Sequence, residues 1–491
     1  MPKAKPYDWK FYVKLCIALV LMFGSGKLFP TWATVTPVGV SAIGIFIGVL
    51  LMVTTGFGMI FPCILGMFAM QLTGYYNSAT ILSGSMGSTS IYQMITFFAL
   101  SQALMATGAA DVIARWFITR KFTQGKPVLF TFMFNLGAVI IGSLMDMGGM
   151  IFYYAILESI CHQLEYEEDS KWYKLMVMGV NVCCCVGFTL LPFKGMPLLI
   201  FGTFASVMAG LGYAINFSAY LVTAIFMCVL FAIVYTLLLR YFWKVDMSKL
   251  KDLDVSTLAG GDKLKMSRGQ VIVSLGYALA ILYAIVLLFL PKGAAFTTWF
   301  SSISQPIWSG VMFAILCIIH VDGKPVIEGE KIMKDGISWS ILISTGAFVL
   351  LGGMISSPDL GVRDWLASVM TSLVGNMSFP IFMLLIIVIT YVVTNFFSSV
   401  ATGLIMMTLC APIAASFAES IGINPAIVGY AIMAADMYAY LTLAASATSP
   451  IFLGHKAVAD DNHLIWVTGG FCGLVFIVLC WAVSTLMAFV L

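Results

Sequence analysis

The chain alternates long apolar runs with short polar loops along its whole length. A helix needs about 20 mostly apolar residues to cross a bilayer core of about 30 Å. Runs of that size predict membrane-spanning helices at residues 11–29, 36–54, 57–75, 90–108, 173–192, 214–240, 270–290, 301–319, 338–356 and 464–490. The pattern therefore indicates an all-α integral membrane protein.

Three apolar regions depart from this pattern. Residues 128–160 and 379–417 are each long enough to enter the membrane and return, so we expect re-entrant hairpins there. Residues 424–455 are apolar but interrupted at Ala447–Pro450, which predicts a broken helix. Irregular backbone at membrane depth persists only where protein or a water-filled cavity satisfies it, so such segments are candidates for the functional site.

The composition agrees with a membrane protein and excludes other classes. Of the 491 residues, 61% are hydrophobic and 10% are charged, whereas a soluble domain is about a quarter charged. This balance excludes a soluble enzyme, a disulfide-rich secreted protein and a disordered regulator. The net charge of +3 gives no reason to expect nucleic acid as a partner. No metal-ligand spacing, P-loop or nucleophile motif occurs, so we expect neither an enzyme nor a metal or other cofactor site.

Lysine and arginine predict the orientation. With the N-terminus in the cytoplasm, Lys27, Lys292 and Arg363 fall outside and Lys194 falls within the membrane. The other 21 of the 25 basic residues then fall on the cytoplasmic side. Cytoplasmic loops carry an excess of basic residues, so this count supports a multi-pass protein of the cell (cytoplasmic) membrane with a cytoplasmic N-terminus.

The two halves of the chain match each other at one offset of 253 residues. The matching positions are Gly108, Asp111 and Ala114 with Gly361, Asp364 and Ala367; Pro127 with Pro380; Thr189–Leu190 with Thr442–Leu443; and Pro197 with Pro450. In the topology above Asp111 is cytoplasmic and Asp364 is external, so the repeat is inverted. Inverted repeats with interrupted helices are typical of secondary transporters, whose substrate site lies near the midplane between the repeats.

Two ionisable residues of the first half fall at membrane depth. Asp146 lies at the tip of the first predicted hairpin, and Lys194 lies in the proline-flanked segment Leu191–Pro197. Charged groups at this depth are costly and are candidates for function. They form either a structural ion pair or a functional one, in which Lys194 places a fixed positive charge beside the substrate and Asp146 is its partner or a proton carrier. We favour the functional pair.

In the second half, the tip of the predicted hairpin (within Thr394–Thr402) and the break at Ala447–Pro450 carry hydroxyl groups instead. Helix N-termini at such breaks suit an anion, although Ser and Thr can also bond back to their own helix carbonyls. Asp436 lies 11 residues before Ala447, about 16 Å along a continuous helix, so we expect it near the outer mouth. The candidate substrate-binding residues are Asp146, Lys194, Gly195, Ser398, Ser399, Thr402, Thr448, Ser449 and Pro450.

The arrangement of spans, hairpins and breaks resembles the divalent anion/sodium symporter (DASS) family of the ion transporter superfamily. The resemblance is clearest in the segments Thr394–Thr402 and Ala447–Pro450. The resemblance covers essentially the whole chain. It implies a homodimer that moves its substrate by an elevator mechanism. It also implies a scaffold at 1–126 and 264–378, a transport domain at 127–245 and 379–491, and a cytoplasmic linker at 246–263.

The resemblance further implies Na⁺ as the coupling ion, with Ser398, Ser399, Ala447 and Thr448 as candidate cation ligands in the second half. Lys194 occupies the region of the first implied Na⁺ site, where an ammonium group would repel the ion strongly. Exchange or coupling to H⁺, without Na⁺, is therefore the expectation for this chain.

Together these patterns predict a secondary active transporter of a small anion, most directly a di- or tricarboxylate. The alternatives are a Na⁺-coupled anion symporter and a transporter of a zwitterionic or cationic solute held by Asp146. An anion channel is disfavoured, because the polar residues cluster at one depth instead of lining a continuous pore. Besides the solute, the expected partners are the lipid bilayer and a second copy of the chain.

Overall fold

The computed structural model describes residues 9–491 apart from 56, 146, 168, 194, 216, 254–264, 291–294, 366–367, 369–376, 444, 447 and 460. Asp146, Lys194 and Ala447, three of the predicted site residues, lie outside the described residues.

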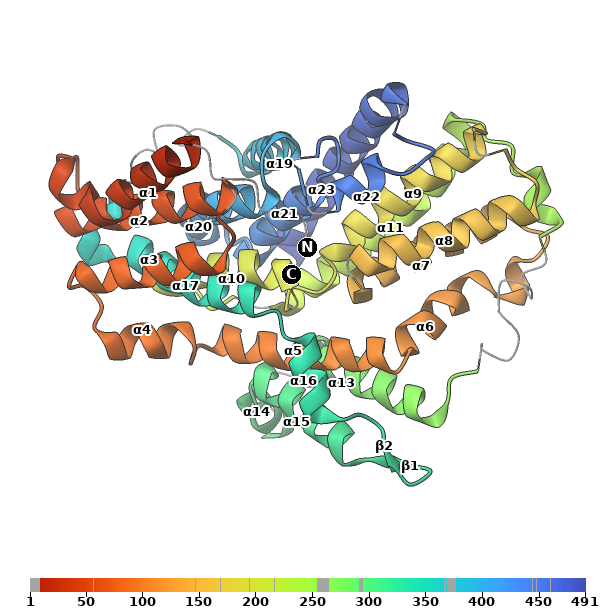
Figure 1. Ribbon diagram of the computed structural model, residues 1–491, viewed down its shortest axis with the longest axis horizontal. Helices are drawn as coiled ribbons and strands as arrows, with labels where there is room; N and C mark the ends of the chain where they lie inside the picture. Colours follow the sequence, from red (N-terminus) through yellow and green to blue (C-terminus); the bar gives the residue numbers. More distant parts are fainter. Residues whose placement is uncertain are drawn as a thin grey trace.

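The first half of the chain is helical throughout (Figure 1). Its elements are α1 (Trp9–Leu28), α2 (Pro37–Thr54), α3 (Ile60–Leu72), α4 (Ser78–Ser85), α5 (Thr89–Ala106), α6 (Ala109–Ile118), η1 (Lys121–Thr123), α7 (Pro127–Met145), α8 (Met147–Gln163), α9 (Lys171–Phe188), α10 (Gly195–Gly210), α11 (Phe217–Leu237), η2 (Leu238–Phe242) and η3 (Ser248–Lys251).

The second half repeats this order and adds one short antiparallel strand pair. Its elements are α13 (Arg268–Phe289), α14 (Ala295–Ser302), α15 (Gln305–Ile318), β1 (His320–Val321), β2 (Lys324–Pro325), α16 (Gly329–Gly336), α17 (Trp339–Ser356), η5 (Pro358–Leu360), α19 (Phe379–Phe396), α20 (Ser399–Ile421), α21 (Pro425–Met437), α22 (Ser449–Leu453), η6 (Leu464–Thr468) and α23 (Gly469–Val490).

The expected all-α membrane architecture is confirmed. Among the described residues, seven helices are long and apolar enough to cross a membrane, and six shorter apolar helices accompany them. Both predicted hairpins occur as the helix pairs α7–α8 and α19–α20; that they re-enter the membrane remains a prediction. The second break is longer than predicted, because α21 ends at Met437 and helix resumes only at Ser449.

The repeat seen in the sequence is also present in the backbone. Gly108 and Gly361 both adopt left-handed conformations, with φ of 69° and 66°, a region that glycine enters without a steric penalty. Gly108 separates α5 from α6, and the axes of these two helices differ by 69°. At Gly361 a side chain would also collide with the carbonyl oxygen of Thr34. Both matched positions therefore need glycine for the turn they make.

The helices pack in two groups. One group contains α1–α5 and α13–α17, and the other contains α7–α11 and α19–α23; α6 connects the two groups and packs mainly on α7. The main contact between them is α10 against α17, where Ser206 Oγ donates to the Val349 carbonyl at 3.0 Å. The predicted division into a scaffold and a transport domain, each moving as a unit, remains a prediction.

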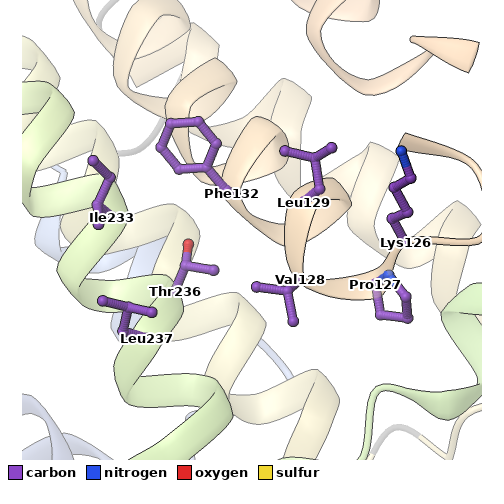
Figure 2. A pocket seen from close by; sticks show the side chains of 8 residues that line it. All are labelled: Lys126, Pro127, Val128, Leu129, Phe132, Ile233, Thr236 and Leu237. Carbon is purple, nitrogen blue, oxygen red and sulfur yellow. The ribbon is translucent and has the colours of Figure 1, made fainter. Parts of the chain in front are cut away.

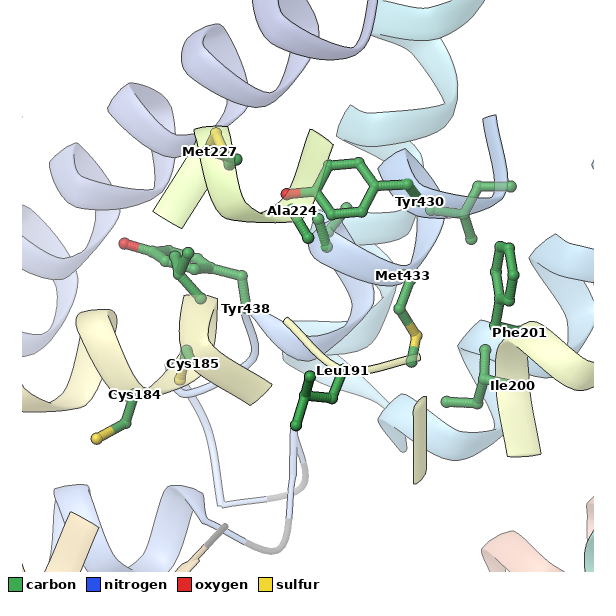
Figure 3. Close-up of a cluster of buried hydrophobic side chains, with 14 of the residues drawn as sticks. Cys184, Cys185, Leu191, Ile200, Phe201, Ala224, Met227, Tyr430, Met433 and Tyr438 are labelled. Carbon is green, nitrogen blue, oxygen red and sulfur yellow. The ribbon is translucent and has the colours of Figure 1, made fainter. Parts of the chain in front are cut away.

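The second group has a dense apolar core (Figure 3). Leu191, Ile200 and Phe201 from the first half meet Tyr430 and Met433 from the second half there. Because residues from both halves are buried together, the two broken helices are held next to each other by apolar packing.

Candidate functional site

A cavity of about 560 Å³ lies where the two helix groups meet. Its volume is in the usual range for small-molecule sites, about 300–1,000 Å³. The hairpins and broken helices supply Met145, Phe188, Gly195, Met196, Pro197, Ser398, Ser399, Val400, Met437, Ala445, Ser446 and Thr448. The other group supplies Phe98, Ser101, Gln102, Met105, Gly336, Ser338 and Ile341. This described lining contains no charged side chain.

The N-terminus of α20 forms one wall of the cavity. Ser398 precedes the helix, and its hydroxyl makes no capping bond. The N–H of Ser399 donates to the Ala445 carbonyl at 3.0 Å. The N–H groups of Val400 and Ala401 have no hydrogen-bond partner among the described residues. Such free N–H groups carry the positive end of the helix dipole and favour an anion.

The N-terminus of α10 forms a second wall. Gly195 begins this helix with a left-handed φ of 54°, and Pro197 follows in the first turn, where a missing N–H costs little. The preceding Phe193 is fully buried, with its ring 4.4 Å from that of Phe97. Two helix N-termini, one from each half, therefore lie on the same cavity.

A cluster of hydroxyls lies at the end of the second break. Ser446 Oγ donates to the Ala439 carbonyl at 2.8 Å and lies 2.9 Å from both Thr448 Oγ1 and Ser449 Oγ. The Ser449 hydroxyl also lies 3.2 Å from the Ala439 carbonyl, and it accepts from the Ser446 N–H at 3.1 Å. Ser449 is fully buried behind the cavity, whereas Ser446 and Thr448 line it.

Asn395 of α19 holds the unwound segment in place. It is 1% exposed, and its Oδ1 accepts from the N–H groups of Tyr440 and Leu441 at 3.0 and 2.9 Å. Its Nδ2 donates to the Tyr391 and Tyr438 carbonyls at 2.9 and 3.2 Å. One amide thus satisfies backbone groups that the broken helix leaves unpaired at membrane depth.

The backbone of Asn395 also joins the hairpin to the second break. The Thr442 hydroxyl donates to the Asn395 carbonyl at 2.6 Å. Together with the bond from Ser399 N–H to Ala445, this contact fixes the segment that carries Ser446 and Thr448 against the hairpin tip.

The structure brings four of the sequence-predicted residues to the cavity: Gly195, Ser398, Ser399 and Thr448. Thr402 and Ser449 lie behind its wall, 3% and 0% exposed. Pro450 borders a different, shallow hollow with Leu441, Thr442 and Trp466.

The expected position of Asp436 near the outer mouth is wrong. That expectation assumed one helix from Asp436 to Ala447, but α21 ends one residue after Asp436. Asp436 is fully buried, and a Cβ on Gly403 of α20 would lie 2.7 Å from its Oδ2. Neither carboxylate oxygen makes a hydrogen bond to a described residue, although the Thr394 hydroxyl and the Gly403 N–H lie in its vicinity.

Sequence reasoning missed several residues of the site. Gln102 and Ser338 belong to ordinary spans or span ends and give no signal in the pattern. Asn395 lies inside the segment Thr394–Thr402 and Ser446 directly precedes Ala447–Pro450, and their polar side chains at membrane depth were the available signal.

A second hollow of similar volume, about 550 Å³, differs in chemistry (Figure 2). It is a shallow groove between α7 and α11, lined by Val128, Leu129, Phe132 and Ile233, with Lys126 at its edge. Thr236 in this groove already bonds to Asn135 and to the Ala232 carbonyl. Its apolar surface suits lipid chains, so the cavity between the helix groups is the better candidate for a polar solute.

Two solved structures share this fold. MtrF of Neisseria gonorrhoeae, presented with a class of antimetabolite efflux pumps, matches with a TM-score of 0.61 at 12% identity over 100% of this chain and 96% of its own. The YdaH transporter of Alcanivorax borkumensis matches with a TM-score of 0.52 at 15% identity over 83% of this chain and 86% of its own. At these identities the likeness shows the fold alone. No curated protein sequence matches this chain significantly.

The family model for citrate transporters (CitMHS) matches residues 49–435. This range includes the first hairpin, the first broken helix and the second hairpin, and it ends at the residue before Asp436. The narrower resemblance to the DASS family remains a prediction. The fold, the cavity at the helix breaks and the extent of this match together show that the chain is a membrane transporter, not an enzyme, and that it belongs to the citrate transporter family.

Proposed function

We propose that this protein is a secondary active transporter of a small di- or tricarboxylate. The observation that carries the proposal is the meeting of two helix N-termini, at Gly195 and Ser399, on one cavity whose described lining holds no carboxylate. Free N–H groups and the hydroxyls of Ser398, Ser399 and Thr448 are suited to carboxylate oxygens. Membership of the citrate transporter family supports the same solute class.

The proposed coupling is exchange or H⁺ symport without Na⁺. Its basis is the sequence, which places Lys194 directly before Gly195 and Asp146 directly after Met145, two residues that line the cavity. A lysine charge there would take the place of a bound cation, and Asp146 would serve as its partner or as the proton carrier.

The second candidate is a Na⁺-coupled symporter. The specific observation in its favour is the hydroxyl cluster in which Thr448 Oγ1 and Ser449 Oγ each lie 2.9 Å from Ser446 Oγ. Oxygen-rich clusters suit hard cations such as Na⁺. Ser398, Ser399 and Ala447 would complete that proposed site.

An elevator-type movement and a homodimer complete the proposal. The helix groups meet mainly through α10 and α17, which would have to slide past each other during such a movement.

The test is uptake of labelled citrate and succinate into proteoliposomes. The conditions are a Na⁺ gradient, a pH gradient, or unlabelled solute inside, each applied separately. Uptake that needs internal solute and ignores Na⁺ supports exchange, and uptake driven by a pH gradient supports H⁺ coupling. Uptake driven only by Na⁺ favours the second candidate. Failure to transport either acid, with uptake of a zwitterionic solute instead, contradicts the proposal and favours a solute held by Asp146.

A further inference from the structure

The cavity wall opposite the helix breaks is formed by residues near one end of α5, α16 and α17. On α5 (Thr89–Ala106) the lining residues run from Phe98 to Met105, in the second half of the helix. On the other side of this wall they are Gly336, the last residue of α16, and Ser338 and Ile341 around the start of α17. The cavity therefore lies toward the end of the molecule where α5 finishes and α17 begins.

That end of the molecule carries basic residues. Lys331 and Lys334 lie on α16, and Arg115 and Arg120 follow the end of α5. Since basic residues concentrate on the cytoplasmic side of membrane proteins, the orientation predicted from the sequence places the cavity toward the cytoplasm.

Gln102 is a polar residue of this wall without an internal partner. Its neighbour Ser101 bonds to the Tyr277 hydroxyl at 3.5 Å, but Gln102 makes no side-chain hydrogen bond to the described residues. A Cβ on Gly336 would lie 2.5 Å from Gln102 Cβ and 2.9 Å from its Cγ. The end of α16 therefore closes directly on the stem of Gln102, while the amide keeps two donors and one acceptor for a solute.

We propose that Gln102 contacts the solute by donating a hydrogen bond to a carboxylate, and that it does so only in the cytoplasm-facing state. The proposal rests on the proposed function. For the cavity to open on the other side, the wall formed by the helix breaks must leave the cytoplasmic half of α5, and Gln102 then loses the solute. The contacts of Ser398 and Thr448 lie on the same wall as the helix breaks and persist in both states.

The test measures the apparent KM for citrate separately on each face, using right-side-out and inside-out vesicles. Removing one hydrogen bond to a charged group weakens binding roughly tenfold. Gln102→Leu should therefore raise the cytoplasmic KM about tenfold and leave the external KM within about twofold. The isosteric Gln102→Glu preserves packing against Gly336 but repels an anion, so it should raise the cytoplasmic KM further than Gln102→Leu does.

Gln71→Leu is the matched control. Gln71 is an exposed glutamine of α3 that bonds to Ser78, away from the cavity, so its replacement should change neither KM. Thermal unfolding of each purified variant shows that it is folded.

Each outcome separates the two proposals. Unchanged KM values in Gln102→Leu, with normal wild-type transport, overturn the role of Gln102 and leave the proposed function standing. Equal increases on both faces overturn the one-sided contact. Absence of binding and transport of both citrate and succinate in the wild type overturns the proposed function and this assignment together.

Discussion

The two broken helices place similar N-termini on one cavity but are stabilised in different ways. The first break, between Phe188 and Gly195, is short and is held mainly by apolar burial of Leu191 and Phe193. Its described cross-link is the Tyr220 hydroxyl, which donates to the Thr189 carbonyl at 2.8 Å. The second break, between Met437 and Ser449, is longer and depends on the hydrogen bonds of Asn395.

This difference separates the tasks of the two breaks. The first break contributes a helix N-terminus in an apolar frame, whereas the second contributes the hydroxyls of Ser446 and Thr448 to the cavity. A polar network at membrane depth is stabilising only while it is fully bonded. Substitutions in the second break should therefore lower stability and transport together, and substitutions in the first should act mainly through packing.

Replacing Asn395 should have the largest effect. Asn395→Leu leaves the N–H groups of Tyr440 and Leu441 buried without an acceptor, which we expect to cost roughly 2–4 kcal/mol of unfolding free energy and to abolish transport. Asn181 of α9 is the matched control, because it is fully buried and neither of its amide atoms is bonded to a described residue. Asn181→Leu should be neutral or stabilising in thermal unfolding. Equal losses in both variants would contradict the role given to the Asn395 bonds.

The next effect concerns the contact between α20 and Asp436. Gly403→Ala would bring a methyl group to 2.7 Å from Asp436 Oδ2 and 2.8 Å from Ile200 Cγ2, so we expect a loss of about 1–3 kcal/mol with reduced transport. A Cβ added at Gly202 of α10 would enter open space, so Gly202→Ala should instead raise the unfolding free energy by about 0.5–1 kcal/mol through helix propensity. Denaturation of both purified variants checks this pair. A harmless Gly403→Ala would show that Asp436 can move away.

A smaller loss is expected from the hydroxyls at the tip of the second hairpin. Ser398→Ala and Ser399→Ala should each raise the KM for citrate by roughly threefold to tenfold, because each removes one donor to a carboxylate. Stability should not change, since neither hydroxyl makes a bond within the described protein. Ser420→Ala, at the far end of α20, should leave uptake kinetics unchanged. An effect on maximal rate without any change in KM would argue against direct contact.

The smallest effect concerns Asp461, in the loop before the last helix and outside the spans. Its carboxylate accepts from the Leu464 N–H at 2.9 Å and pairs with Lys174 of the first half at 3.0 Å. The Leu464 N–H, followed by Lys174, lowers the pKa of Asp461. Asp461→Asn should cost about 1 kcal/mol at neutral pH.

The stability loss in Asp461→Asn should depend on pH, in a direction set by the lowered pKa of Asp461. A carboxylate whose pKa is lowered by folding stabilises the protein above its unfolded pKa, near 3.9, and this contribution disappears as the pH falls through the folded value. The stability difference between wild type and Asp461→Asn should therefore shrink below about pH 4. A difference that stays constant from pH 7 to pH 3 would mean that the charge of Asp461 contributes nothing.

Much of the fold followed from the apolar pattern, because span length and breaks are local properties of the sequence. The two hairpins, the break before Gly195 and the match of Gly108 with Gly361 were all visible there. The length of the second break was not, because the chain unwinds at Tyr438 in response to Asn395, which is distant in sequence. The error in placing Asp436 has the same origin.

The site could be predicted only in part. Ser398, Ser399 and Thr448 were found because hydroxyls next to a predicted break are unusual. Gln102 could not be found, since a glutamine in an ordinary span gives no signal until packing places it opposite the helix breaks. Which hydroxyls face the cavity, as Thr448 does and Ser449 does not, depends on side-chain direction and not on spacing.

The most direct test of the central claim is protection of a cysteine at the cavity by the solute. Ser398→Cys is made in a background without Cys16 and Cys317, the described cysteines that are not buried, and Ser420→Cys serves as the control. The account predicts that saturating citrate slows alkylation of the thiol at position 398 roughly tenfold or more and leaves that at position 420 unchanged. Equal alkylation rates at position 398 with and without citrate, in a variant that still binds citrate, would contradict the placement of the solute between the two broken helices.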